Sequence, residues 1–191
     1  EGGAEFVSED GSKADGYINS DKSIKTAEYL NEFIKNGYAN LDPVKDEFLN
    51  GKAATLLGGS WNIADLEKSD LNWGVSYFPV ADDGKAASPT GDWAATITKD
   101  SKNPDAAGKF LQWAMSSDNI ATYASAVAKP ASRISSYEKM EGWDSGARAL
   151  MKWQLQNTGV SRPRTPSYSV LSTDFSAAML NIFAGADAKE E

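Results

Sequence analysis

The sequence predicts an α/β fold in which helices flank a small mixed sheet. Segments with apolar residues at helical spacing alternate with shorter, β-rich segments, and Gly, Pro, Asn and Asp separate them. Hydrophobic residues make up 41% and charged residues 24% of the 191 residues. This is the composition of an ordinary globular protein, and the length is sufficient for a sizeable core.

The first predicted helix ends at about Asn36, and residues 1–18 before it are polar, Gly-rich and expected to be irregular. Asn19 or Ser20 can cap the start of this helix, because their side chains accept hydrogen bonds from free backbone N–H groups. Gly37 follows the last helical residue, where a glycine commonly ends a helix.

The middle of the chain is predicted to contain short helices and strands. A short helix is expected after Asp42-Pro43, because proline is favoured at the first helical position. Ser60 can cap another helix, which then carries Trp61 in its first turn. Three segments are predicted to be strands, since they are short, apolar or alternating, and bounded by turn residues: 53–57, 73–80 and 93–98.

The carboxy-terminal part of the chain is expected to be mainly helical. Lys129-Pro130 and the prolines of 162–166 interrupt the helical pattern, because proline lacks the N–H group that a helix interior needs. Between and beyond these interruptions apolar residues keep helical spacing. The helices expected here follow Asn103-Pro104, run from Asp118 to about Val127, run from Ser145 to about Leu155, and cover 170–184 up to Gly185.

Composition excludes several classes of function. The net charge is −8 and no stripe of Lys and Arg offsets it, so nucleic acid and anionic membranes are unfavourable partners. The chain has no Cys and no His, which rules out disulfides, thiol nucleophiles, Ser-His-Asp triads and Cys- or His-based metal sites within it. Carboxylates, Lys, Tyr, Ser and Arg remain for catalysis, and on the interpretation developed below we expect no metal, no cofactor and no catalytic residue.

A tryptophan directly after two glycines is the most informative local feature. Gly58-Gly59-Ser60-Trp61 follows a predicted strand and opens a predicted helix, and ligands of α/β sheets bind at such turns. The glycines allow close approach of a ligand to the backbone. The indole is a flat apolar plate that suits the C–H face of a pyranose ring. The pattern alone fits equally well with Trp61 packing as core behind the helix.

Four stretches, in the same order, resemble the extracellular solute-binding proteins of carbohydrate ABC transporters, the maltose-binding-like family. Each stretch is weakly diagnostic alone, and their order across nearly the whole chain carries the resemblance. They are 48–54 leading into 58–61; 73–79 followed by 91–97; 101–111 followed by 129–133; and 162–168.

The resemblance implies a two-lobed periplasmic-binding-protein-like fold of type II, of which this chain is mostly the carboxy-terminal lobe. Members of the family are about twice as long, so the resemblance implies that the amino-terminal half is missing here. The start of the chain has no signal-peptide pattern, as expected for a mature chain or a piece of a longer one. By resemblance, residues 1–88 and 131–191 form the carboxy-terminal lobe. Residues 89–130 contain two hinge crossovers, near 89–91 and 129–130, and a segment that packs in the other lobe.

The function that the resemblance implies is capture of an oligosaccharide in an interlobe cleft, followed by delivery to the permease subunits of an ABC importer. Such a protein is no enzyme, and it works outside the cell or in the periplasm, often held by a lipid anchor. Three alternatives stay open: a glycosidase with two carboxylates, a binder of a non-sugar solute, and an interaction domain without a small ligand.

Ligand contacts implied by the resemblance lie in three short stretches. The resemblance favours ligand contact for Trp61 and Trp93 over burial, whereas Asp92 is equally well explained as a turn residue. Trp143 is expected to line the cleft or, preferably, to pack against the start of the next helix. Arg162 lies in a stretch that the family places near the cleft, and a surface ion pair is an equally good expectation for it. Trp73, Trp113 and Trp153 are expected in the core. The predicted ligand-binding residues are Gly59, Ser60, Trp61, Gly91, Asp92, Trp93, Arg164 and Tyr168.

Overall fold

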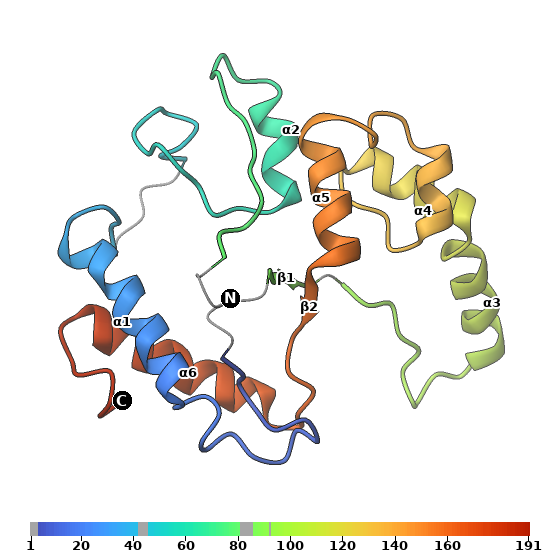
Figure 1. Ribbon diagram of the computed structural model, residues 1–191. Coiled ribbons are helices and arrows are strands. Elements are labelled where there is room, and N and C mark those ends of the chain that lie inside the picture. Colours follow the sequence, from blue (N-terminus) through green and yellow to red (C-terminus); the bar gives the residue numbers. More distant parts are fainter. Residues whose placement is uncertain (1–3, 42–45, 81–85, 92) are drawn as a thin grey trace. The chain divides into compact units, whose positions relative to one another are not determined.

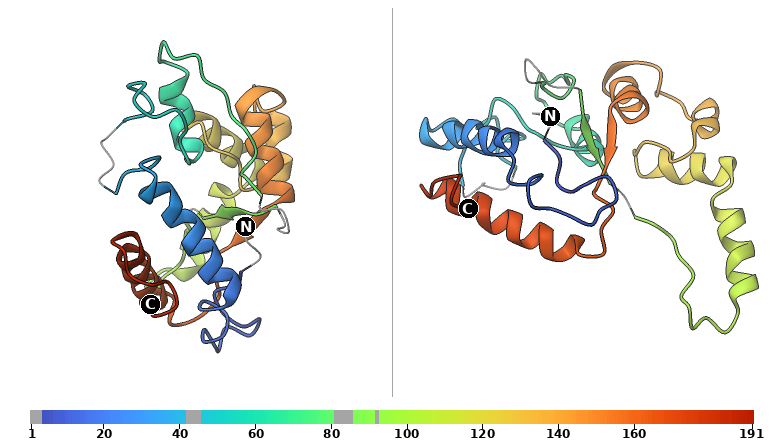
Figure 2. Two further views of the ribbon diagram at one scale, coloured as in Figure 1. Left: turned by 60° about the vertical axis from the view of Figure 1, so that its left-hand side comes forward. Right: turned by 60° about the horizontal axis from the view of Figure 1, so that its bottom comes forward.

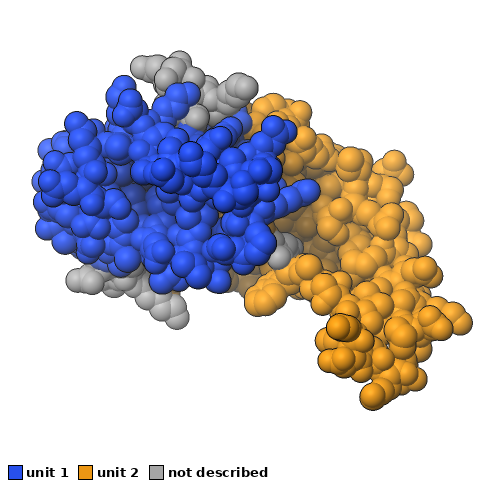
Figure 3. Space-filling model, turned by 90° about the horizontal axis from the view of Figure 1, so that it is seen from below, with its two compact units in different colours: residues 1–45, 78–89, 160–191 blue, residues 46–77, 90–159 orange. Residues whose placement is uncertain are grey.

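The structure is a computed structural model that describes residues 4–41, 46–80, 86–91 and 93–191 (Figures 1 and 2). The chain forms two compact units, which Figure 3 shows in blue and orange. Unit 1 comprises Glu1–Lys45, Phe78–Pro89 and Val160–Glu191, and unit 2 comprises Asp46–Tyr77 and Thr90–Gly159. Each unit therefore contains segments that are far apart in the sequence.

Unit 1 is built around two helices, α1 (Asp21–Lys35) and α6 (Tyr168–Phe183), which lie side by side in Figure 1. The predicted start of α1 is confirmed, because the Ser20 hydroxyl accepts a hydrogen bond from the backbone N–H of Ser23 (3.4 Å). The buried Asn31 side chain joins the two helices: its Nδ2 donates to the carbonyl of Ile182 (2.9 Å). This contact spans nearly the whole sequence and is invisible in local patterns.

Glycines end both helices of unit 1, as predicted. Gly37 follows α1 with φ +71°, and Gly185 follows α6 with φ +111°, a region of backbone space that favours glycine. The described residues before α1 contain no helix or strand, in agreement with their polar, Gly-rich composition. Phe6 in this segment packs edge-on against Phe175 of α6, with ring centroids 4.9 Å apart.

Unit 2 contains all the other helices of the described residues. The helices predicted after Asn103-Pro104, from Asp118 and from Ser145 are confirmed, with starts shifted by no more than one residue. The helices of unit 2 are η1 (Ser60–Asn62) and η2 (Ile134–Lys139), both 3-10 helices, and the α-helices α2 (Ile63–Leu66), α3 (Pro104–Ala114), α4 (Ser117–Ala126) and α5 (Gly146–Asn157).

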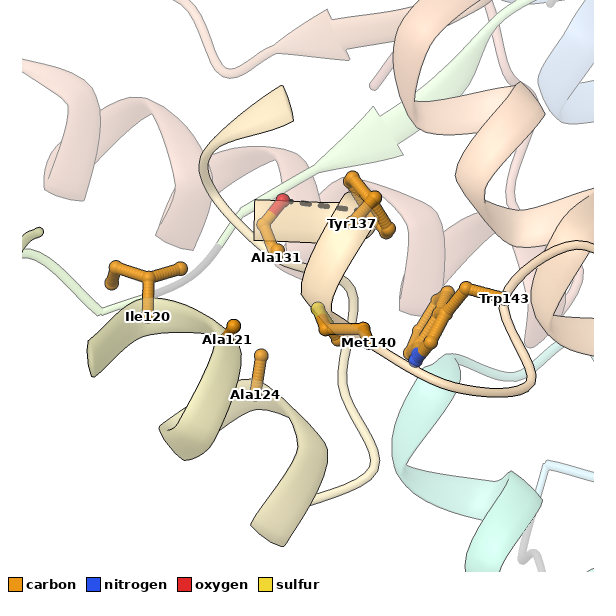
Figure 4. Packing of buried hydrophobic residues seen from close by; sticks show 7 residues of the cluster. All are labelled: Ile120, Ala121, Ala124, Ala131, Tyr137, Met140 and Trp143. Atoms are coloured by element: carbon orange, nitrogen blue, oxygen red, sulfur yellow. Dashed lines mark hydrogen bonds between the residues drawn. The ribbon is translucent and has the colours of Figure 1, made fainter. Parts of the chain in front are cut away.

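The core of unit 2 lies between α4, η2 and the loop that follows η2 (Figure 4). Trp143 is 2% exposed and packs edge-on against Tyr137, with ring centroids 5.6 Å apart. The Tyr137 hydroxyl donates to the carbonyl of Ala131 (3.3 Å), and burial raises the pKa of this phenol. Trp143 is thus a core residue, not a cleft residue. The cluster consists of Ile120, Ala121, Ala124, Ala131, Tyr137, Met140 and Trp143.

The strand predictions for 53–57, 73–80 and 93–98 are wrong. Among the described residues only β1 (Ser88–Thr90) and β2 (Gly159–Ser161) pair, in a two-stranded sheet. A strand needs a regular ladder of hydrogen bonds to a neighbour, and none of the three predicted segments is assigned to a strand in the part of the chain described here. Their apolar side chains are consequently largely exposed, Leu57 among them.

The described part of the short helix predicted after Asp42-Pro43 is not helical. Residues 42–45 lie outside the described residues, and Asp46–Asn50 form a hydrogen-bonded turn in which Asp46 has φ +62°. A left-handed residue at this point is incompatible with continuing a right-handed helix. No helix in the described ranges has the length and apolarity needed to cross a membrane.

Candidate functional site

Trp61 lies on the surface of unit 2, in the 3-10 helix η1. It is 67% exposed, so it is not the core residue that the alternative interpretation required. The prediction that Ser60 caps this helix is wrong. Gly59 occupies the capping position, Ser60 is the first helical residue, and the Gly59 N–H donates to Oδ1 of Asn62 (3.2 Å). The amide side chain of Asn62, the last residue of η1, therefore accepts a hydrogen bond from the residue that precedes the helix.

The indole of Trp61 folds back over Gly59. A Cβ atom built on Gly59 would lie 2.2 Å from Cζ3, 2.3 Å from Cη2 and 2.6 Å from Cε3 of Trp61. No real Cβ contact is that short, so the ring occupies space that only glycine leaves open. Sequence reasoning interpreted this glycine as room for a ligand, whereas in the structure the indole fills that room.

Trp93 is also exposed in unit 2, at 92% of its surface. It lies in an extended segment that is neither helix nor strand, two residues after the exposed Gly91. Asp92, between them, lies outside the described residues. In a strand, alternate side chains point to opposite faces, and this alternation could have buried Trp93. The segment does not form the predicted strand, so the alternation does not bury the indole.

Two tryptophans predicted to be core are exposed. Trp113 on α3 is 63% exposed and lies against Phe110, with ring centroids 5.8 Å apart. Trp153 on α5 is exposed and packs edge-on against Tyr77, with centroids 4.8 Å apart. Trp73 is half-buried. Helical spacing identified an apolar face on α3 correctly, but no residue of α3 is buried among the described parts of the chain.

The predicted ligand-binding residues near the carboxy terminus belong to unit 1. Arg164 is exposed in a segment that is neither helix nor strand, and Tyr168 is the half-buried first residue of α6. The guanidinium of Arg162 lies over the Tyr168 ring at 5.8 Å from its centroid, a cation–π arrangement. The tyrosine ring therefore has one face toward a cation.

A glycine that sequence reasoning missed supports this segment. Gly11 is buried with φ +72°, and a Cβ built on it would lie 2.2 Å from the carbonyl oxygen of Arg164. The preceding Asp10 organises the turn by accepting hydrogen bonds from the hydroxyls of Ser8 (2.6 Å) and Ser12 (2.8 Å). These bonds lower the pKa of Asp10 to about 2. Asp-Gly is a turn signal, but its contact with Arg164 is not local.

The predicted site residues are divided between the two units. Gly59, Ser60, Trp61, Gly91 and Trp93 belong to unit 2, and Arg164 and Tyr168 belong to unit 1. Within the described residues, no group of three or more Asp or Glu side chains could hold a metal ion.

Known proteins with similar sequences bind oligosaccharides. The chain is 33% identical over 79 residues to the maltodextrin-binding protein MdxE of Bacillus subtilis (strain 168), covering 41% of this chain and 19% of that protein. It is 24% identical over 184 residues to the galactooligosaccharide-binding protein of the same organism, covering 91% of this chain and 43% of that protein. The chain thus spans less than half the length of these relatives.

A solved structure has the same fold. The cyclic alpha-maltosyl-1,6-maltose binding protein of Arthrobacter globiformis superposes with a TM-score of 0.79 at 21% identity, over 99% of this chain and 49% of that one. The α/β fold of solute-binding proteins, predicted from four short stretches, is thereby confirmed. Residues 2–153 match the family model for the bacterial extracellular solute-binding protein. The chain therefore belongs to the bacterial extracellular solute-binding proteins, a family of binding proteins rather than enzymes.

Proposed function

We propose that this chain is the sugar-recognising part of the substrate-binding component of an ABC importer, which captures an oligosaccharide and delivers it to a membrane permease. The exposure of Trp61, a flat indole on the surface of an extracellular solute-binding protein, carries this proposal. Relatives named for maltodextrin and galactooligosaccharide binding support a carbohydrate ligand.

The proposed contacts combine stacking with hydrogen bonding. Trp61 and Trp93 stack on the C–H faces of sugar rings, because both indoles are exposed and both are large rigid apolar surfaces. Arg164 donates from its fixed fork of N–H groups to neighbouring hydroxyls. The remaining contacts are hydrogen bonds from backbone or side-chain groups of Gly59, Ser60, Gly91, Asp92 and Tyr168.

Capture is proposed to occur by closure of two lobes on the ligand. Residues 1–88 and 131–191 belong to one lobe, and residues 89–130 contain the hinge crossovers and the segment that packs in the other lobe. A ligand that contacts both lobes stabilises the closed state over the open one, and this difference in affinity drives the movement. Closure then presents a surface that the permease recognises.

The second lobe is proposed to come mainly from a preceding part of a longer protein. This chain spans 43% of one relative and 49% of a protein with the same fold, which leaves room for that part. The exposed apolar face of α3, with Phe110 and Trp113, is the kind of surface that such a part would cover. A lipid anchor ahead of it would hold the protein outside the cell membrane or in the periplasm.

Titration of the full-length protein with linear maltodextrins and galactooligosaccharides, followed by tryptophan fluorescence, tests the proposal. Saturable binding is expected, and Trp61→Ala should weaken it by about 2–4 kcal/mol, as aromatic hot spots do. Trp153→Ala is the matched control, since Trp153 lies against Tyr77 and is not proposed to touch the ligand. Equal losses in both variants would assign the effect to folding.

Other outcomes distinguish the alternatives. If the protein binds a peptide or a polyamine and no sugar, the proposed ligand class is wrong, whereas the assignment of the fold is unaffected. Release of reducing sugar during incubation would indicate a hydrolase. No saturable response to any solute would contradict the proposal.

A further inference from the structure

We propose that Gly59 is a positioning residue that fixes the Trp61 indole as a stacking plate with a single open face. This role differs from direct ligand contact. The identity of the stacked ligand rests on the proposed function, whereas the positioning itself rests only on the geometry of residues 58–62.

Space, and not backbone conformation, requires glycine at position 59. Gly59 has φ −118° and ψ −179°, an extended conformation that any residue adopts. The conflict appears only on adding a side chain, because a Cβ would meet three consecutive ring carbons of Trp61 at 2.2–2.6 Å. Their nearly equal distances put this point above the face of the ring and not beyond its edge.

Gly59 therefore lies against one face of the six-membered ring of the indole, while 67% of the residue remains exposed. Because the contact with Gly59 already restricts rotation of the Trp61 indole in the free protein, the indole loses little rotational freedom on binding. The ligand ring can approach from the open side only. Trp61 consequently accepts one ring and cannot be sandwiched between two.

Asn62, the residue directly after Trp61, contributes a further contact to this arrangement. Its Oδ1 accepts the hydrogen bond from the Gly59 N–H (3.2 Å), which ties the glycine two residues before Trp61 to the residue after it. A Cβ built on Gly58 would lie 2.6 Å from the same Oδ1. The two adjacent glycines thus have separate tasks: Gly58 leaves room for the Asn62 amide, and Gly59 leaves room for the indole.

The first test does not involve a ligand. Full-length protein labelled with 5-fluorotryptophan is compared by fluorine NMR before and after Gly59→Ala, and Trp61→Phe identifies the Trp61 signal. The added methyl group must turn the indole into another rotamer, so the Trp61 signal is expected to shift. Gly74→Ala is the matched control, because nothing lies within 4 Å of its built Cβ. An unchanged Trp61 signal in Gly59→Ala overturns the proposal.

The second test measures affinity for maltotriose and for a galactooligosaccharide. Gly59→Ala is expected to weaken binding about tenfold or more, approaching Trp61→Ala, with an unchanged urea midpoint. Asn62→Ala should weaken binding less, and Asn62→Asp, which keeps the acceptor, should restore it. A shifted Trp61 signal with unchanged affinity overturns the positioning role and leaves the proposed function standing. If the wild-type protein binds neither sugar, the proposed function fails, and the fluorine shift alone decides whether Gly59 holds the ring.

Discussion

Replacing Trp143 by alanine is expected to remove the largest side chain from the core of unit 2. Trp143 is 2% exposed and contacts the cluster that joins α4 to η2. A tryptophan buries at most about 250 Å², which corresponds to about 6 kcal/mol at about 25 cal/mol per Å². The unfolded chain already hides part of this area, which lowers the figure to about 4–5 kcal/mol.

This magnitude is a large share of the stability of the unit. Domains are stable by about 5–15 kcal/mol in total, and large aromatic-to-alanine replacements in cores cost about 3–5 kcal/mol. The Trp143→Ala protein should therefore unfold at much lower urea, and backbone amides of α4 should exchange faster with solvent, because α4 supplies Ile120 and its neighbours to the cluster.

Urea unfolding followed by circular dichroism, combined with hydrogen exchange, measures both effects. Trp93→Ala is the matched control, since the same substitution at a side chain that is 92% exposed should change stability by no more than about 0.5 kcal/mol. Equal losses of stability in the two variants, or amide exchange in α4 that Trp143→Ala leaves unchanged, would refute this role of Trp143 in the core.

Other variants probe unit 1. Asn31→Ala should cost about 1–3 kcal/mol, because the buried Nδ2 of Asn31 donates to an α6 carbonyl, and faster hydrogen exchange in α6 would reveal the loss. Gly11→Ala should destabilise the protein more than Gly16→Ala does. Both glycines have positive φ, but only a Cβ at position 11 would clash with the carbonyl of Arg164. Equal urea midpoints of the two variants would contradict this prediction. The Asp10 carboxyl should titrate by NMR near pH 2, not near its ordinary value, because serine hydroxyls donate to its charged form. The stability from these bonds is present above pH 4 and is lost as the pH falls from about 4 to about 2; an ordinary pKa would show that the turn is not formed.

Helix positions were predictable because their signals are local. The Ser20 cap, the proline at the start of α3, and Gly37 and Gly185 after two helices each act within one turn of their own position. The strands were not predictable in this way, because a strand is stabilised by a neighbour that can lie anywhere in the chain. A run such as 53–57 has the composition of a strand but no partner among the described residues.

The sequence by itself determined which residues are apolar, which turns end the helices, and, through motifs in a fixed order, the family. Only the tertiary structure decided which tryptophans are buried and which are exposed. Trp143, in a polar loop, is buried, whereas Trp113, in an apolar helical pattern, is exposed. Periodicity reports which face of a helix avoids water, but burial depends on which distant segment covers that face. Close approaches such as Gly59 to the Trp61 ring and Gly11 to the Arg164 carbonyl likewise arise only when the chain is folded.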